Sequence, residues 1–462
     1  MIGVECKVLG EGMAMTQPNR RACLQTMLAL GAGVGGAATW PHRLAAKMKS
    51  ANTGRKLIVL WMPGGPSQLD TFDLKPGHEN GGEFKELQTS VPGMRFSEHL
   101  PQLAKQAERL ALVRSMQTKE GDHSRGTYLI RTGQRPGAPL RYPSLPAALA
   151  KELSSPYPNL PGYVSILPNT FINPAAFGSG FLGASREPLT VAGTASFDPQ
   201  QSAADDSQTA DEPVNLRVDN LLPPENLVVE RLRQRREFWE LLQESYGARR
   251  RVGAPATHDT VYRRAMELAE SDLVAAFDLK QESTATRERY GNDSFGQGCL
   301  MARRLIERDV SVVEVSLSDG PGGLSWDSHA DNFSTVQRLS ERLDRSWSQL
   351  MLDLASSGLL EQTTIVWMGE FGRTPKINEN AGRDHFPNAW TCVLTGAGIQ
   401  GGSIVGATSS GGQEVTDRPV AAADFLATLC RAVGVDPDTE NMAEDRRPIK
   451  LVEGVPLHEI LA

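Results

Sequence analysis

Apolar runs alternate with polar loops along most of the chain. Five short runs end abruptly in glycine, proline or charged residues, as buried strands do where they enter loops. They span residues 55–62, 110–113, 310–317, 364–368 and 390–394. Between them, apolar residues recur at helical spacing, with stops at Gly133 and Gly358. Strand-then-helix units with polar loops at the strand ends predict an α/β protein with a doubly wound, mostly parallel sheet flanked by helices.

The middle of the chain departs from this pattern. The stretch FDPQQSAADDSQTADEP is acidic, rich in Ser, Ala and Gln and poor in aromatic residues, which is typical of a mobile surface segment. Two amphipathic helical patterns follow, at 228–242 and 262–277. We therefore expect residues 184–290 to form an acidic excursion plus a helical insertion within a single domain that spans 47–462.

An arginine pair precedes the first long apolar stretch. Arg20 and Arg21 stand directly before LQTMLALGAGVGGAATW, and Ala45-Ala46 offers a possible processing point. This arrangement resembles a twin-arginine export signal. We expect residues 1–46 to direct the chain, through the twin-arginine export machinery, to the periplasm or the outside. Gly, Gln and Thr interrupt the apolar stretch, so no stable membrane span is expected in the mature chain.

Composition narrows the classes of function. With 462 residues, 40% of them hydrophobic, the chain can bury a large core. Its 48 Lys and Arg residues against 55 Asp and Glu residues give a net charge of -7, without the basic surplus that nucleic-acid binding requires. Cys299, Cys392 and Cys430 are far apart and odd in number, which indicates buried free thiols and not a disulfide framework.

Candidate chemistry gathers in the loops that follow the predicted strands. Asp327 and His329 follow the run 310–317, and in extended backbone their side chains point the same way and can share a divalent ion. The other candidates in such loops are Asp70, Asp122, His123, Ser124, Arg125, Glu370, Arg373, Arg383, Asp384 and His385. For the aspartates alone, capping of a turn or helix is the common role. Their convergence behind several strands is what favours a functional site.

Four segments resemble the bacterial secreted family known as domain of unknown function 1501, from Lys56 to about Asp436. They are LIVLWMPGGPSQLDTFD, FGQGCLMARRLIERDVSVVEV, WDSHADNF and VWMGEFGRTPKINENAGRDHFPNAW. That family is similar in organisation to the alkaline phosphatase and sulfatase superfamily, which hydrolyses phosphate or sulfate esters with one or two divalent ions. The resemblance implies that Asp327, His329, Glu370 and His385 bind metal. It also likens the stretch from His123 to Gly133 to the segment that bears the sulfatase nucleophile.

Two departures from the superfamily pattern qualify this resemblance. Pro63, Gly64 and Gly65 stand where the superfamily has an acidic ligand after the first strand, so Asp70 would have to substitute from farther along. Gly121 stands where the sulfatase cysteine would be. Ser124 or Thr118 would then be the nucleophile.

The sequence therefore predicts an exported, metal-dependent hydrolase of phosphate or sulfate esters. Ser124 and His123 would be catalytic, and Arg125 and Arg373 would bind the anionic group of the ester. Zinc, calcium or manganese would be held by Asp70, Asp327, His329, Glu370, Asp384 and His385. The alternative is a secreted binding or scaffold protein that kept the fold and lost the chemistry, because the early acidic ligand and the nucleophile are displaced.

Overall fold

The computed structural model describes most of the chain after residue 53. The described residues are 54–137, 139–153, 161–193, 214, 216–218, 229–247, 262–263, 265–269, 271, 274–319 and 323–462. The predicted export signal, 1–46, and the acidic stretch, 197–213, lie outside them. Among the described residues, no helix combines the length and apolar character needed to cross a bilayer.

A large sheet forms the centre of the structure. Its strands follow the order β13-β4-β12-β9-β1-β8-β5-β6-β7, with β16 beside β4. Their bounds are β1 Lys56–Trp61, β4 Leu110–Gln117, β5 Tyr163–Ile166, β6 Leu189–Gly193, β7 Leu216–Arg217, β8 Val312–Ser316, β9 Thr363–Met368, β12 Trp390–Gly396, β13 Ser403–Val405 and β16 Val420–Ala421. Most neighbours are parallel, but β12 runs antiparallel to both β9 and β4. The predicted α/β class with a mostly parallel sheet is thus confirmed.

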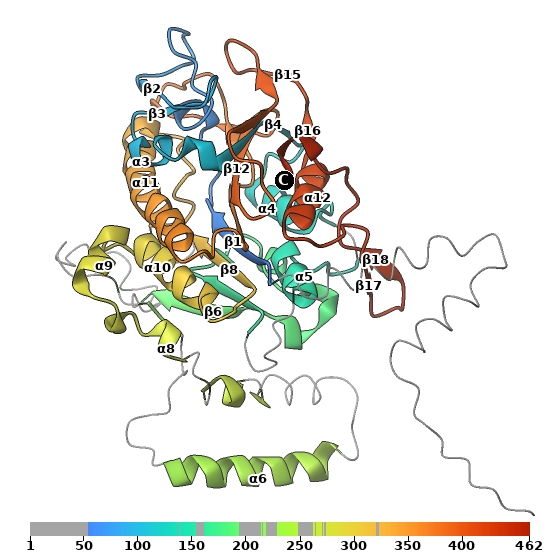
Figure 1. The fold of residues 1–462 in the computed structure, drawn as a ribbon. Coiled ribbons are helices and arrows are strands. Elements are labelled where there is room, and N and C mark those ends of the chain that lie inside the picture. Colours follow the sequence, from blue (N-terminus) through green and yellow to red (C-terminus); the bar gives the residue numbers. More distant parts are fainter. Residues whose placement is uncertain are drawn as a thin grey trace, which may run out of the picture. The chain divides into compact units, whose positions relative to one another are not determined.

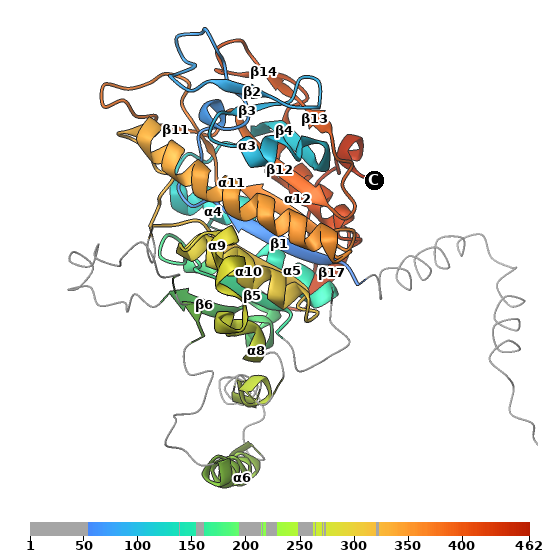
Figure 2. The ribbon, with the colours of Figure 1, turned by 60° about the vertical axis from the view of Figure 1, so that its left-hand side comes forward.

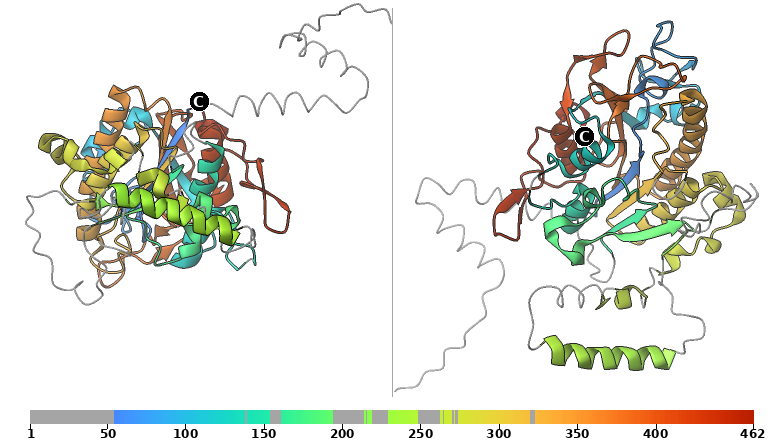
Figure 3. Two further views of the ribbon diagram at one scale, coloured as in Figure 1. Left: turned by 90° about the horizontal axis from the view of Figure 1, so that it is seen from below. Right: turned by 180° about the vertical axis from the view of Figure 1, so that it is seen from behind.

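Helices cover both faces of this sheet (Figures 1 and 2). The helices of the chain with described bounds are α3 Pro101–Ala104, α4 His123–Thr132, α5 Leu145–Glu152, α6 Val229–Gly247, α8 Val274–Phe277, α9 Thr284–Tyr290, α10 Ser294–Ile306, α11 Asn332–Ser356 and α12 Ala422–Ala432. Helices α9, α10 and α11 pack on one face, and α4, α5 and α12 on the other, as the views from below and behind also show (Figure 3).

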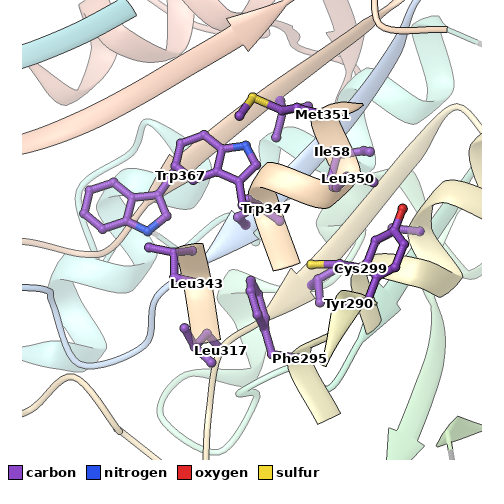
Figure 4. Close-up of a cluster of buried hydrophobic side chains, with 14 of the residues drawn as sticks. Ile58, Tyr290, Phe295, Cys299, Leu317, Leu343, Trp347, Leu350, Met351 and Trp367 are labelled. Atoms are coloured by element: carbon purple, nitrogen blue, oxygen red, sulfur yellow. The ribbon is translucent and has the colours of Figure 1, made fainter. Parts of the chain in front are cut away.

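Two apolar cores follow from the alternation of side chains along the strands. Ile58 and Leu60 of β1 enter the core under α10 and α11, whereas Leu57 and Val59 enter the core under α4, α5 and α12. Figure 4 shows the first core, where Trp347 and its neighbours on α11 meet Phe295 of α10. A strand apolar on both faces is what two helical layers require.

Helix boundaries agree with the capping signals in the sequence. Asp122 precedes α4, and its side chain accepts a hydrogen bond from the Arg125 amide at 3.0 Å. Gly133 ends the same helix with a φ of 71°, a left-handed conformation that glycine adopts without a Cβ clash. Cys299, Cys392 and Cys430 are buried free thiols, as predicted.

Two strands fall within the range 184–290, which is predicted to hold the acidic excursion and the helical insertion. Strand β6 pairs in parallel with β5, and β7 adds an antiparallel strand to β6, so part of this range belongs to the sheet edge. Only Val191 of β6 is fully buried, so this strand, the last but one at this side of the sheet, has no clear apolar alternation. Four short hairpins lie outside the large sheet: β2 Glu86–Gln88 with β3 Arg95–Ser97, β10 Gly372–Arg373 with β11 His385–Phe386, β14 Ala407–Thr408 with β15 Val415–Asp417, and β17 Glu440–Met442 with β18 Pro448–Lys450.

Candidate metal centre

The loops after β1, β4, β8 and β9 meet at one edge of the sheet. These four strands run in the same direction. Strands β8 and β9 are parallel to β1, and β4 has the direction of β9 because both are antiparallel to β12. Ligand sites of α/β proteins form outside the carboxyl ends of such strands. The loops bring together residues that lie hundreds of positions apart in the sequence.

Three histidines surround one aspartate at this edge. The Nε2 atoms of His329 and His385 lie 3.1 and 3.2 Å from Oδ1 of Asp327. Nε2 of His123 lies 3.3 Å from Oδ2 of the same carboxylate. The two Nε2 atoms of His329 and His385 are 3.0 Å apart. We call His123, Asp327, His329 and His385 the His–Asp cluster.

Each histidine of the His–Asp cluster has its other ring nitrogen beside an acceptor. Nδ1 of His123 lies 2.6 Å from Oε1 of Glu370, and Nδ1 of His329 lies 2.8 Å from Oδ1 of Asp384. Nδ1 of His385 lies 2.8 Å from the carbonyl oxygen of Gly121. Because carboxylate and carbonyl oxygens only accept, each Nδ1 must carry the proton. In the neutral rings, the three Nε2 lone pairs then face the Asp327 carboxylate.

Arg373 holds the carboxylate from the buried side. Its Nη2 donates to Oδ1 of Asp327 at 2.5 Å, and its Nε donates to the carbonyl oxygen of Gly65 at 3.0 Å. Nη2 also donates to the carbonyl oxygen of Gly64. The guanidinium is fully buried, and these contacts use its donors. The predicted substrate-binding role of Arg373 therefore does not fit its position, since it faces Asp327 and the loop after β1.

The loop after β1 has no room for a side chain at Gly64. A Cβ there would lie 2.4 Å from the amide nitrogen of Asp327, and the φ of Gly64 is +108°. Its own amide donates to Oε1 of Glu370 at 2.9 Å. The glycine therefore lets the first loop approach Asp327 and Glu370 closely, at the place where the superfamily pattern has an acidic side chain.

Electrostatics mark the site as rich in negative charge. Burial by itself lowers the pKa of His123, but the carboxylates of Asp327 and Glu370, one beside each ring nitrogen, outweigh burial and raise the pKa to about 9. Burial raises the pKa of Asp327, yet the neighbouring rings of His123 and His385 and the charge of Arg373 hold it well below its usual range.

The donor set fits a divalent cation. One ligand atom from each of His123, Asp327 and His385 lies within 4.8 Å of the others. Nε2 of His123 is buried and has no hydrogen-bond partner, although it lies 3.3 Å from Oδ2 of Asp327. Oε2 of Glu370 is also buried and unbonded. Three imidazoles and a carboxylate are an ordinary ligand set for zinc or manganese, with His329 completing it from the exposed side.

The structure distributes the predicted residues differently from the sequence-based hypothesis. Glu370 and Asp384, predicted as ligands, bind the Nδ1 atoms of His123 and His329 and so orient these rings. His123, predicted as catalytic, instead presents Nε2 to the cluster. Asp327, His329 and His385 lie together, as predicted.

Asp70 lies outside the His–Asp cluster. Its two carboxylate oxygens accept hydrogen bonds from Arg383 at 2.7 and 3.0 Å, and both residues are fully buried. Ser67 and Asn332 donate to the same carboxylate at 2.5 and 2.9 Å. All these contacts tie the loop after β1 to the start of α11 and to the β10–β11 hairpin. A carboxylate used in this way is structural, and a metal would have to displace Arg383.

The remaining predicted residues lie around the first turn of α4. Arg125 is exposed and forms a two-pronged ion pair with Glu120, at 2.6 and 3.0 Å. Oγ of Ser124 accepts a hydrogen bond from the side chain of Asn173 at 3.3 Å. Oγ1 of Thr118 is buried and has no hydrogen-bond partner. No hydrogen bond is described between either hydroxyl and the His–Asp cluster.

Sequence reasoning missed two contributors to the site. The carbonyl of Gly121, which orients His385, carries no sequence signal because any residue has a carbonyl. Gln68 donates to the carbonyl of Arg373 at 2.8 Å and accepts from its amide at 2.9 Å, so it fixes the hairpin strand that carries Arg373. The sequence indicated a role for Gln68 only by its position near Asp70 in the first polar loop.

A cleft of about 550 Å³ lies beside the β10–β11 hairpin. Its lining combines apolar, amide and charged side chains: Glu79, Asn80, Thr374, Pro375, Lys376, Ile377, Phe386 and Gln413. Thr374 and Phe386 also flank Asp384 and His385, since the Thr374 amide donates to the carbonyl of Asp384 at 2.8 Å. The cleft thus adjoins the segment that carries part of the site.

Fold and site together define an α/β protein with a candidate divalent-metal centre at the carboxyl edge of its sheet. The chain belongs to the family described as "Protein of unknown function (DUF1501)", whose model matches residues 54–461. No curated protein matches the sequence.

Several solved structures are similar to this chain at low identity. The lipoteichoic acid synthase LtaP from Listeria monocytogenes is 10% identical over 84% of this chain and 73% of its own, with a TM-score of 0.34. The PsFucS1 sulfatase from Pseudoalteromonas sp. is 13% identical over 86% and 72%, with a TM-score of 0.33. The phosphonate monoester hydrolase SpPMH from Silicibacter pomeroyi is 14% identical over 87% and 75%, with a TM-score of 0.35. These values assign no activity to this chain.

Proposed function

We propose that this chain is an exported, metal-dependent hydrolase of phosphate or sulfate esters. One observation carries the proposal: three imidazole Nε2 atoms converge on the Asp327 carboxylate while each Nδ1 is held by an acceptor. Histidines that bind metal show this pattern, because the outer acceptor fixes the tautomer and the ring orientation. The ester chemistry is supported by the segments WDSHADNF and VWMGEFGRTPKINENAGRDHF, which hold most of these residues.

The proposed ligands are His123, Asp327, His329 and His385. Imidazole-rich sets suit zinc or manganese better than calcium, which prefers six to eight oxygen ligands. When bound, a divalent cation supplies Lewis acidity toward an anionic ester oxygen. Export rests on the arginine pair Arg20-Arg21 and the apolar stretch behind it.

The residues of the chain supply positioning. Glu370 is fully buried and holds the Nδ1 proton of His123, while Asp384 and the Gly121 carbonyl hold those of His329 and His385. Arg373 keeps Asp327 ionised and in place. His329 is 46% exposed, so the cluster is open to solvent and substrate on that side. The adjoining cleft has room for the alcohol portion of an ester.

Ser124 remains the proposed nucleophile, with water as the alternative. It follows His123 in the first turn of α4, beside the residues of the His–Asp cluster. Hydrolysis breaks the ester bond to sulfur or phosphorus and gives the alcohol and the free acid. Replacement of Ser124 by Ala distinguishes the two nucleophiles, because only a serine nucleophile would form a trapped covalent ester.

The test combines metal analysis with turnover. Purified protein should retain a stoichiometric divalent ion and hydrolyse 4-nitrophenyl phosphate, 4-nitrophenyl sulfate or bis(4-nitrophenyl) phosphate. Substitution His123→Ala or Asp327→Ala should abolish both properties, whereas His458→Ala, the same kind of change at an exposed histidine, should preserve them. Absence of bound metal together with absence of turnover would favour a binding or scaffold role instead.

A further inference from the structure

The fixed charges around the His–Asp cluster can be counted from its contacts. Asp327 is in the cluster, and three ionised side chains touch it: Glu370, Asp384 and Arg373. Three carboxylates and one guanidinium sum to a charge of -2 when the histidines are neutral, as metal-binding histidines are. A single divalent cation therefore neutralises this set.

Arg373 supplies positive charge on the side of Asp327 where a second metal ion would otherwise bind. Its guanidinium is fully buried, lies 2.5 Å from Oδ1 of Asp327 and donates to the carbonyls of Gly64 and Gly65. No acidic side chain can be added at Gly64, because a Cβ would lie 2.4 Å from the Asp327 amide. The side of Asp327 toward β1 thus holds a permanent positive charge and offers no further carboxylate.

Two other arginines near the site are already paired. Arg383 is buried against Asp70, and Arg125 forms its ion pair with Glu120. Asp122, beside His123, caps the first turn of α4 and so offsets the positive end of the helix dipole. None of these groups adds free positive charge for an anionic ligand.

We infer that the site binds one divalent ion and selects tetrahedral esters with a single negative charge, namely sulfate monoesters or phosphate diesters, over dianionic phosphate monoesters. This inference rests on the proposed function. Once a divalent ion is bound, the site has no net charge and therefore does not attract the second negative charge of a dianion. The dianion must nevertheless lose its stronger hydration when it binds. Glu370 and Asp384, close behind the ligands, repel that second charge.

Binding measurements test this inference independently of turnover. Metal-depleted protein is titrated with Mn²⁺ or Zn²⁺, and one ion per chain is expected. The loaded protein is then titrated at pH 8 with methyl sulfate and dimethyl phosphate, which are monoanions, and with methyl phosphate, which is a dianion. We expect at least one monoanion to bind about threefold or more tightly than methyl phosphate. The two monoanions separate a sulfate site from a phosphodiester site.

A charge variant sharpens the test. Asp384→Asn removes one negative charge from an exposed side chain and keeps Oδ1 as an acceptor for His329. It should shift the preference toward methyl phosphate by about twofold to threefold, and the shift should shrink at high salt. Glu288→Gln, the same charge change at an exposed residue of α9, should shift nothing.

The outcomes decide the inference separately from the proposed function. Two ions per chain, no monoanion binding, or tighter binding of methyl phosphate than of both monoanions would overturn it. Selective binding of monoanions without hydrolysis of any aryl ester would instead support it and refute the catalytic part of the proposed function.

Discussion

Substitution of Gly64 by alanine should damage the metal centre more than it damages the fold. The new Cβ would lie 2.4 Å from the Asp327 amide nitrogen and 2.8 Å from the carbonyl carbon of Trp326. Ordinary contacts begin at 3.4 Å, so the backbone of Asp327 must retreat by about 1 Å. Both obstacles are backbone atoms, which no rotamer change can move aside.

Gly137 provides a matched control for this substitution. Its φ of +101° is close to the +108° of Gly64, but a Cβ at Gly137 would meet nothing within 4 Å. Alanine at either position costs about 1–2 kcal/mol for the left-handed backbone. Gly64→Ala adds about 1–3 kcal/mol of overpacking, so it should destabilise the protein by about 2–5 kcal/mol in total.

The assay compares the two variants in denaturant unfolding and in metal titration. A displacement of 1 Å at a ligand costs about 100-fold in function at well-ordered sites, so Gly64→Ala should weaken metal binding by roughly that factor. Gly137→Ala should bind metal as the unaltered protein does. Equal metal affinities in the two variants would refute the reasoning that Gly64 positions Asp327.

Three further predictions follow from other contacts. Glu370→Gln should weaken metal binding by about 10–100-fold, measured by competition with a chelator, because an amide orients imidazole less firmly. Glu314→Gln should lower the free energy of unfolding by about 3–5 kcal/mol, because it leaves the fully buried Arg131 without its charged partner, which lies at 2.6 Å in the unaltered protein. A smaller loss in the double variant Glu314→Gln with Arg131→Met would confirm that the two side chains stabilise the protein as a pair. Burial raises the pKa of Glu282, but the hydrogen bond from Arg304 and the charge of a second arginine lower this pKa overall. Ionised Glu282 therefore stabilises the fold above its unfolded pKa of about 4.3, and this stabilisation is lost as the pH falls below that value. Glu282→Gln should therefore flatten the pH dependence of the free energy of unfolding between about pH 5 and 3, by at most about 1 kcal/mol.

Local patterns were sufficient for the elements that carry the site. The run before Pro63 became β1, the stretch between Asp122 and Gly133 became α4 with the predicted end at Gly133, and the run 364–368 became β9. These features depend on apolar periodicity and on capping within a few residues, which the chain encodes locally. Strand β6 was missed because it buries one side chain and shows no periodicity.

Membership of the site was also largely predictable, whereas the role of each residue was not. His123, Asp327, His329, Glu370, Asp384 and His385 do lie together, because each follows a strand whose carboxyl end reaches the same edge. Sequence alone could not distinguish a ligand from the group that orients it. His123 and Glu370 are 247 positions apart, and which of them faces the centre depends on how α4 packs against β9.

What the sequence by itself determined is the α/β class, the main helices and strands, and the set of polar residues at the strand ends. Only the tertiary structure decided that Asp70 is tied to Arg383, that Arg373 is buried behind Asp327, and that three imidazoles share one carboxylate. The physical reason is the distance along the chain over which each kind of interaction acts. Periodicity and capping act over a few residues, but the partner of a buried charge is chosen by packing across the whole sheet, where every ionised group must find an opposite charge or a hydrogen bond.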